Sequence, residues 1–245
     1  MKALTYQEKN AWPKPVEVDR PESEEGEVLV RLKTAALNRR DVYIIQGLYP
    51  NVKKGVILGS DGAGWVDDRP VLIQPGLYWG ADRRVQSDRY QILGMPTDGT
   101  FAEYIALPEE NVFSIPKHLD FEEAAALPLA GLTAYRATIV KGKASEHKKI
   151  LITGIGGGVA QLAMTFSKAV GAKIYVTSSS DEKIKAAKEA GAEGGVNYKD
   201  DDWPKQLKEL AGSYDLIVDG AAGEGFKHYI ELAAPAARIV LYGGT

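Results

Sequence analysis

The stretch KKILITGIGGGVAQLAMTFSKAVG (148–171) decides the fold of this chain. Its first six residues, KKILIT (148–153), form an apolar run of the length of a buried strand. The glycine-rich segment GIGGGVA (154–160) follows at once, and VAQLAMTFSKAVG (159–171) has the spacing of an amphipathic helix that Gly171 ends. A strand, a glycine turn and a helix in direct succession predict the first unit of a parallel sheet with crossover helices.

The alternation of strands and helices continues to the end of the chain. Beyond KKILIT, the predicted elements are strands at residues 172–177, 194–198, 214–220 and 237–244 and a helix at residues 181–191, with further helical stretches between the last strands. Strand–helix alternation predicts a doubly wound parallel sheet of the Rossmann type, with helices on both faces. About five strands are accounted for, so the fold class is α/β.

The first 115 residues or so have a different pattern, with short strands between frequent turns. Strands are predicted at residues 28–37, which alternate, at 56–66, which three glycines interrupt, and at 69–76 and 99–107, which Gly and Pro bound. This pattern indicates a β-rich unit, a small distorted barrel. Near Asp120 it changes to an Ala- and Leu-rich helical stretch, residues 121–140, interrupted at Pro128. The sequence therefore predicts two domains, residues 1–120 and 121–245.

The glycine turn has the character of a dinucleotide site. Glycine lets the backbone approach a pyrophosphate, whose charge the helix N-terminus then stabilises. The match to G-x-G-x-x-G/A is imperfect, since one register places Val159 at the third glycine and the other places Ile155 at the first. The alternative is a flexible turn that only connects strand and helix. The candidate pyrophosphate residues are Gly156, Gly157, Gly158 and Val159.

The end of the second strand predicts which dinucleotide is bound. Enzymes that use NAD place Asp or Glu there for the ribose 2′-hydroxyl. In this chain Ser178 occupies that place, with Ser179 beside it and Lys183 on the following helix. Hydroxyl groups and a lysine suit a 2′-phosphate, so the predicted cofactor is NADP(H) rather than NAD(H). Ser179-x-x-Glu182 is also a capping box for the helix that begins near Asp181, and both roles are compatible.

Composition excludes several other classes. The 245 residues carry a net charge of −3, which gives no reason to expect nucleic acid or an anionic membrane as a partner. No apolar run approaches the roughly 20 residues that span a bilayer, and the N-terminus is not a signal peptide, so a cytoplasmic location is expected. The chain has no cysteine, and its three histidines are far apart in sequence, so no metal site is predicted.

The order of several motifs resembles a known family. These are AALNRRDVYIIQGLYP (35–50), LGSDGAG (58–64), DGTFAEY (98–104), LPLAGLTAY (127–135) and the glycine turn. Together they resemble the medium-chain dehydrogenase/reductase superfamily, in its zinc-free quinone oxidoreductase-like branch. The resemblance implies that residues 1–120 are a GroES-like domain for substrate and catalysis, and that residues 121–245 are the NADP-binding domain.

In zinc-dependent members of this family, a cysteine, a histidine and a second cysteine hold the catalytic metal. Motif alignment places Asn38, Ser60 and Leu129 at these positions, and none of the three is a competent zinc ligand there. The resemblance therefore implies a reaction without zinc, which makes an alcohol dehydrogenase mechanism unexpected.

The quinone reductase-like branch carries an Asn, an Asp and two Tyr in the cleft around the nicotinamide. Asn38, Asp41, Tyr43 and Tyr49 match them in type and spacing and are the candidate catalytic residues. By the same resemblance, Tyr198 joins Ser178, Ser179 and Lys183 at the 2′-phosphate, and Thr133, Gly243 and Gly244 lie near the nicotinamide. Three alternatives stay open: Asn38-x-x-Asp41 caps a helix beginning near Arg39, the two tyrosines are packing aromatics, and Asp61 is a turn residue.

The implied reaction is hydride transfer from NADPH to a quinone or an α,β-unsaturated carbonyl. The developing charge on the acceptor oxygen needs a donor, for which the Tyr43 or Tyr49 hydroxyl, the Asn38 amide and water are candidates. An enoyl-thioester reductase and a non-catalytic NADP-binding protein are the alternatives. Family members continue past a position matching Thr245, so we expect either a fragment or a shortened chain whose edge strand at 237–244 is covered by a partner or a second copy.

Overall fold

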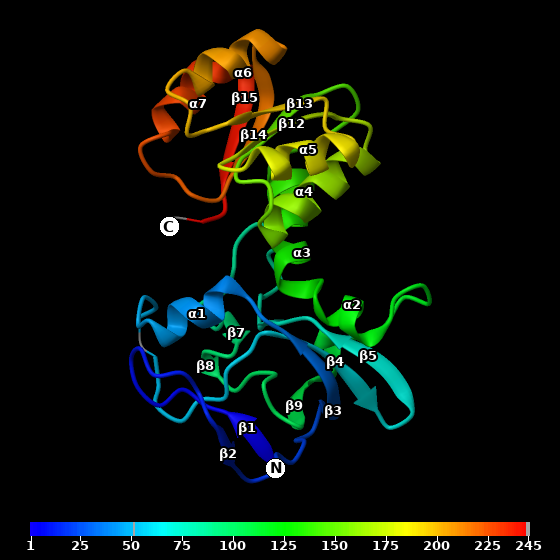
Figure 1. Cartoon of the computed structure of the whole chain (residues 1–245). Coiled ribbons are helices and arrows are strands. Elements are labelled where there is room, and N and C mark those ends of the chain that lie inside the picture. The colour runs from blue at the N-terminus through cyan, green and yellow to red at the C-terminus, as the bar shows by residue number, and fades with distance from the viewer. Residues whose placement is uncertain (51, 244–245) are drawn as a thin grey trace. The chain divides into compact units, whose positions relative to one another are not determined.

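The computed structural model describes residues 1–50 and 52–243, which form two compact units, Met1–Leu129 and Ala130–Thr245 (Figure 1). The sequence-based boundary after residue 120 precedes α2 (Phe121–Ala125). This helix packs against strands β3 (Glu27–Ala36) and β4 (Asp61–Val66) of the first unit. No helix in the described part of the chain combines the length and the apolarity that crossing a membrane requires.

The first unit is rich in short strands, as the sequence predicts. Its strands are β1 (Lys2–Leu4), β2 (Pro15–Glu17), β3 (Glu27–Ala36), β4 (Asp61–Val66), β5 (Arg69–Ile73), β6 (Gly76–Leu77), β7 (Gln91–Leu93), β8 (Pro96–Thr97), β9 (Tyr104–Pro108) and β10 (Val112–Ser114). Five of them form an antiparallel sheet in the order β10-β5-β4-β3-β9, and the others form sheets of three and two strands. The remaining elements are α1 (Arg39–Ile45), the 3-10 helix η1 (Glu109–Asn111) and α2.

The strand predicted over residues 56–66 is shorter in the structure. β4 begins at Asp61, because Gly59 adopts a positive φ of 93° that regular strand geometry does not use. Asp61 is thereby the first residue of a central strand, with β3 on one side and β5 on the other. This position buries a carboxylate at the end of the sheet.

The second unit is a parallel five-stranded sheet in the order β13-β12-β11-β14-β15, which confirms the doubly wound fold. Its elements are α3 (Pro128–Tyr135, which begins in the first unit), the π-helix η2 (Arg136–Lys141), β11 (Lys149–Ile152), α4 (Gly158–Ala169), β12 (Lys173–Ser178), α5 (Asp181–Glu189), β13 (Gly194–Asn197), α6 (Trp203–Ala211), β14 (Tyr214–Asp219), α7 (Phe226–Leu232) and β15 (Ala233–Leu241).

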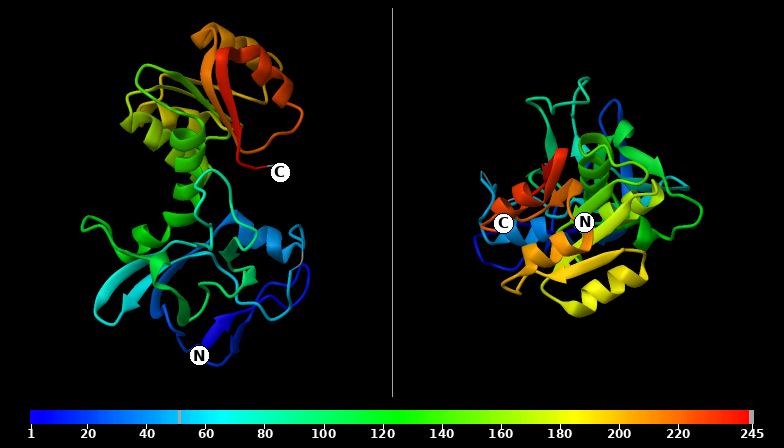
Figure 2. Two further views of the ribbon diagram at one scale, coloured as in Figure 1. Left: turned by 180° about the vertical axis from the view of Figure 1, so that it is seen from behind. Right: turned by 90° about the horizontal axis from the view of Figure 1, so that it is seen from above.

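Alternate side chains of β11 bury against opposite layers of helices. Ile150 and Ile152 pack in a cluster with α4 and α5, while Leu151 packs with α6 and α7. Figures 1 and 2 show the two pairs of helices on the two faces of this sheet. Because the strands run parallel, their carboxyl ends meet at one edge of the sheet, where the glycine turn leaves β11.

Candidate functional site

The glycine turn after β11 is exposed and open. Gly154 and Gly156 have φ of 64° and 116°, values that side-chain-bearing residues rarely adopt. Gly157 is the N-cap of α4, and the nearest heavy atom to a Cβ built on it is 3.7 Å away. The first backbone N–H groups of an α-helix have no partner within the helix, so this turn presents N–H donors beside open space.

Lys183 lies across this turn. A Cβ built on Gly156 would come within 2.7 Å of the Lys183 Cδ and 3.4 Å of its Nζ. Lys183 belongs to α5, the helix that follows β12. Its ammonium group therefore reaches the glycine turn that precedes α4, the helix of the neighbouring crossover. The structure thus brings together two predicted cofactor residues that are 27 positions apart in the sequence.

The loop after β12 differs in detail from its prediction. Ser178 is the last residue of β12 as expected, but its side chain is buried and its Oγ accepts a hydrogen bond from the Ser180 backbone N–H at 3.2 Å. The N-cap of α5 is Ser180, whose Oγ accepts from the Lys183 N–H at 3.4 Å. The helix is therefore capped by the Ser180 side chain in place of the expected Ser179–Glu182 capping box. Ser179 is left exposed on the loop.

Tyr198 lies next to this loop. Its backbone N–H donates to the Ser178 carbonyl at 2.9 Å, and 46% of its surface is exposed. Ser179, Lys183 and Tyr198 are thus accessible side chains on neighbouring segments, whereas Ser178 holds the loop from inside.

A buried acid at the end of β14 was not anticipated from the sequence. The Asp219 carboxylate accepts hydrogen bonds from the Thr153 hydroxyl, from the Ala222 N–H at 2.7 Å and from the Tyr229 hydroxyl at 3.3 Å. Burial raises the pKa of Tyr229, and the neighbouring Asp219 adds to that rise. These hydrogen bonds connect the carboxyl ends of β11 and β14, and Thr153 is the residue immediately before the glycine turn.

The remaining predicted cofactor residues are in the same unit. Gly243 lies against the end of β14, since a Cβ on it would be 2.3 Å from the Gly220 carbonyl oxygen, and only glycine fits there. Val159 is half-buried against the sheet in the first turn of α4, and Thr133 lies half-buried in α3. Gly244 lies outside the described residues.

The predicted catalytic residues lie on α1 or in the segments that flank it in the first unit. Asn38 is the N-cap of α1, and its backbone N–H donates to the Asp41 Oδ2 at 2.7 Å, so the capping role left open by the sequence is present. Asp41 is buried, and burial raises its pKa. Tyr49 packs in a cluster with Ile44 and Leu58. Tyr43 is half-buried on the same helix.

Arg40 is an unexpected member of this group. The residue is buried, its Nη2 donates to the Met95 carbonyl at 2.8 Å, and its guanidinium lies 5.3 Å from the centre of the Tyr49 ring. Its Nε and Nη1 atoms, like the Asp41 Oδ1, are buried without a hydrogen-bond partner among the described residues. Tyr49 therefore packs against a buried cation, as the packing alternative anticipated in part.

Asp61, for which the sequence left a turn role open, lies at the centre of a hydrogen-bond network. It is 1% exposed, its Oδ2 accepts from the Asn38 Nδ2 at 2.9 Å, and its Oδ1 accepts from the Leu129 N–H at 2.8 Å. Burial raises the pKa of Asp61 to about 6, against the two hydrogen bonds, and the charge of Asp41 adds to the rise. The signal available in the sequence was a lone carboxylate inside an otherwise apolar, glycine-rich strand.

The three positions aligned with zinc ligands lie around this carboxylate. Asn38 and Leu129 both donate to Asp61, and Ser60, the residue before it, is fully buried with its hydroxyl donating to the Leu93 carbonyl at 2.7 Å. Within residues 1–50 and 52–243, no group of three or more His, Cys, Asp or Glu side chains is placed to hold a metal ion. The donor set here is a hydrogen-bond network around one acid.

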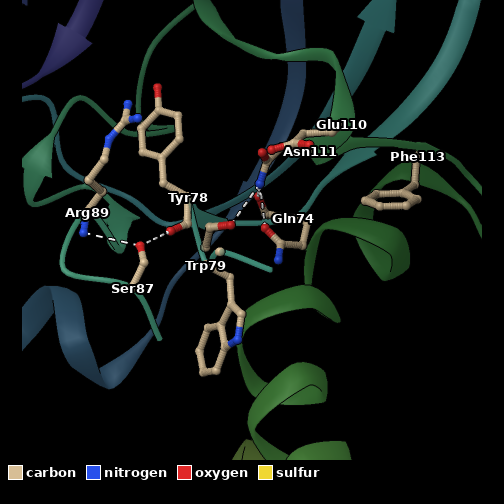
Figure 3. A pocket seen from close by; sticks show the side chains of 10 residues that line it. Gln74, Tyr78, Trp79, Ser87, Arg89, Glu110, Asn111 and Phe113 are labelled. Carbon is tan, nitrogen blue, oxygen red and sulfur yellow. Dashed lines mark hydrogen bonds between the residues drawn. The ribbon is translucent and has the colours of Figure 1, made fainter. Parts of the chain in front are cut away.

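An open cavity of about 580 Å³ also lies in the first unit (Figure 3). Figure 3 shows Arg89 beside Tyr78, with its guanidinium 4.9 Å from the ring centre, and Asn111 donating to the Gln74 Oε1 at 2.6 Å. None of the four predicted catalytic residues lines it; its walls are Gln74, Gly76, Tyr78, Trp79, Gly80, Ser87, Arg89, Glu110, Asn111 and Phe113.

Comparison with known proteins agrees with this architecture. Residues 24–117 match the family described as alcohol dehydrogenase GroES-like domain, and residues 158–245 match the family described as zinc-binding dehydrogenase. The zinc-type alcohol dehydrogenase-like protein YogA of Leptosphaeria maculans is 37% identical over 93% of this chain, which covers 71% of that relative. A second relative, the zinc-type alcohol dehydrogenase-like protein C1773.06c of Schizosaccharomyces pombe, is 34% identical and is covered over 65% of its length.

Solved structures give the same result. A structure described as NAD-dependent alcohol dehydrogenase superposes with a TM-score of 0.92 at 36% identity, covering 98% of this chain and 77% of the other. The quinone oxidoreductase from Thermus thermophilus, solved also as its NADPH complex, superposes with a TM-score of 0.80 at 27% identity, covering 98% and 72%. The chain belongs to the medium-chain dehydrogenase/reductase superfamily of nicotinamide-dependent oxidoreductases.

Proposed function

We propose that this protein is an NADPH-dependent reductase that transfers a hydride, without zinc, to a quinone or an α,β-unsaturated carbonyl. The observation that carries the cofactor assignment is the position of Lys183 across Gly156, beside a strand that ends in serine instead of a carboxylate. In this proposal, residues 121–245 bind the cofactor and residues 1–120 bind the acceptor.

The cofactor fits the turn because its glycines leave room that side chains would fill. Gly157 and Gly158 are exposed, and the nearest atoms to a Cβ built on them are 3.7 and 3.6 Å away. Backbone N–H groups of Gly158 and Val159 would hold the pyrophosphate at the positive end of α4. The Lys183 ammonium, the Ser179 hydroxyl and the exposed Tyr198 would contact the 2′-phosphate, while the buried Ser178 shapes the loop.

The zinc-free assignment rests on the residue types around Asp61. Asn38, Ser60 and Leu129 offer no thiolate or imidazole, and the one carboxylate among them is already engaged by two N–H donors. When bound, NADPH supplies the hydride. The first unit then has to hold the acceptor oxygen and deliver a proton. Tyr43, half-buried on α1, is the side chain that we propose as the donor or as the group that orients a water.

A charge reversal tests the cofactor assignment. Lys183→Glu should weaken NADPH binding roughly 10- to 100-fold, because a charge-assisted contact is replaced by repulsion, and should leave NADH binding nearly unchanged. Lys185→Glu, an exposed change on the same helix, is the matched control and should bind NADPH like the wild type. Dissociation constants from cofactor fluorescence decide it: equal NADPH affinity in both variants would refute the placement of the phosphate.

Turnover is tested separately by following the oxidation of NADPH at 340 nm with a panel of small quinones and enones. Oxidation with one of them supports the reductase. Thermal stabilisation by NADPH without any oxidation would instead favour a dinucleotide-binding protein.

A further inference from the structure

Asp61 makes two hydrogen bonds that reach far along the chain. Asn38 donates from the N-cap of α1, 23 residues before it, and Leu129 donates from the first turn of α3, 68 residues after it. The Asp61 carbonyl also accepts from the Thr100 hydroxyl at 2.7 Å, so the strand end that carries the carboxylate is fixed too. Asp61 thus connects three segments of the first unit.

The chemistry of a carboxylate decides how Asn38 is oriented. An ionised carboxylate only accepts hydrogen bonds, so Asn38 has to present its amide nitrogen to Asp61. The backbone of Asn38 is already fixed by its bond to Asp41, which leaves rotation of the side-chain amide as the remaining freedom. Asp61 removes that freedom and turns the Asn38 Oδ1 to the first turn of α1, where Asn38 and Asp41 form a capping box.

We propose that Asp61 is the positioning residue of the reductase site: its ionised carboxylate holds the Asn38 amide by Nδ2, so that Asn38 Oδ1 caps α1, the helix that carries Asp41 and Tyr43. The catalytic consequence rests on the proposed function, whereas the orientation of Asn38 does not. Asn38 then acts on Tyr43 through the position of α1, rather than as a hydrogen-bond donor to the substrate.

Protonation of Asp61 would reverse this arrangement. A protonated carboxyl can donate, so the Asn38 amide can turn over and present its oxygen to Asp61. Burial raises the pKa of Asp61 to about 6, and the charged group that bears on it is Asp41, whose negative charge favours the protonated form. Arg40 lies on the same helix and bears on Asp41, the hydrogen bonds from Asn38 and Leu129 come from neutral groups, and Ser60 is turned toward Leu93.

The variant Asp61→Asn imposes the reversed orientation at every pH. The oxygen of the introduced amide can still accept from the Leu129 N–H, and its nitrogen forces the Asn38 amide to turn over, so the fold is kept. With NADPH and 1,4-benzoquinone we expect kcat to fall about 10- to 100-fold, with an unchanged KM for NADPH. The wild type should lose activity below about pH 6, and this acid limb should be absent in the variant. A wild-type kcat and acid limb in Asp61→Asn would overturn the proposal.

Two further variants separate positioning from mere folding. In Asn38→Asp/Asp61→Asn the donor and acceptor are exchanged, and the introduced carboxylate can still accept hydrogen bonds at the cap of α1, so both stability and most of the activity lost in Asp61→Asn should return. A kcat as low as that of Asp61→Asn, at wild-type stability, would overturn the proposal. Asp98→Asn removes a carboxylate that accepts from the Ile57 N–H at 2.9 Å in the same unit and should keep both the activity and the acid limb.

The orientation of Asn38 can be followed without any turnover. The ¹⁵N–¹H signals of the Asn38 side-chain amide, identified by their loss in Asn38→Asp, should shift with a midpoint near pH 6 in the wild type and not in Asp61→Asn. Absence of this titration would overturn the inference. Its presence in a chain that does not oxidise NADPH would reject the proposed function alone.

Discussion

Two glycine-rich segments of this chain look alike in sequence and differ in structure. LGSDGAGW (58–65) enters β4 and is buried, and a Cβ on Gly64 would lie 2.1 Å from the Arg31 carbonyl oxygen of the neighbouring strand. GIGGGVA (154–160) is exposed in its glycines, and a Cβ on Gly157 meets nothing closer than 3.7 Å. In the first segment glycine is required by packing, whereas in the second it leaves open space beside the turn, where we propose that the cofactor binds.

The largest loss of stability that tests the difference between the two segments is expected at Gly64. Gly64→Ala forces β4 away from β3, because the clash is with backbone atoms of Arg31 and Leu32, and should cost about 3 kcal/mol of unfolding free energy. Gly157→Ala is the matched control and should change stability by less than about 0.5 kcal/mol. Urea unfolding followed by circular dichroism measures both, and equal losses would contradict the distinction.

A pH dependence should distinguish the buried carboxylate of the first segment from the exposed turn. Burial raises the pKa of Asp61 from 3.8 to about 6, so the folded protein binds a proton that the unfolded chain releases. Its contribution to stability is therefore present at low pH and is lost as the pH rises from about 4 to 6, by roughly 2 to 3 kcal/mol.

The difference between wild type and Asp61→Asn isolates this contribution, because Asp41, whose pKa is also raised, is common to both proteins. Unfolding free energies measured from pH 4 to pH 7 should diverge in favour of the variant as the pH increases. Parallel curves would show that Asp61 does not titrate in this range.

The smallest loss of stability is expected inside the glycine turn, where it tests whether the contact between Gly156 and Lys183 matters for cofactor binding. Gly156→Ala places a side chain at a φ of 116° and against Lys183, so we expect a loss of about 1 to 2 kcal/mol together with weaker NADPH binding. Gly154 also has a positive φ, but nothing lies within 4 Å of a Cβ built on it. Gly154→Ala should therefore lose stability through backbone strain and keep its affinity for NADPH. If both variants bind NADPH equally, the contact between Gly156 and Lys183 has no role in cofactor binding.

Local patterns in the sequence predicted much of the nucleotide unit. Apolar runs, helix-ending glycines and strand–helix alternation depend on neighbouring residues, and they anticipated the five parallel strands and the helices on both faces. Errors were local as well: the α5 cap is at Ser180 rather than Ser179, because serine is a good N-cap residue at either position and the backbone angles decide between them.

The residue types at the predicted sites were also readable, but their partners were not. The sequence showed a serine in place of an acid at the end of β12, and an asparagine and a leucine where family members bind zinc. It did not show that Lys183 crosses Gly156, or that Asp219 ties two strand ends together. These contacts join different crossover units, so neither spacing nor composition encodes them directly.

By itself, the sequence determined the fold class, the glycine turn and the chemical nature of the candidate side chains, because each depends on residues that are close along the chain. The tertiary structure decided which glycines are closely packed and which border open space, and it placed Asp61 at the centre of a hydrogen-bond network. The physical reason is that burial and hydrogen-bond partners come from segments 23 and 68 residues away, and only the folded backbone sets those distances.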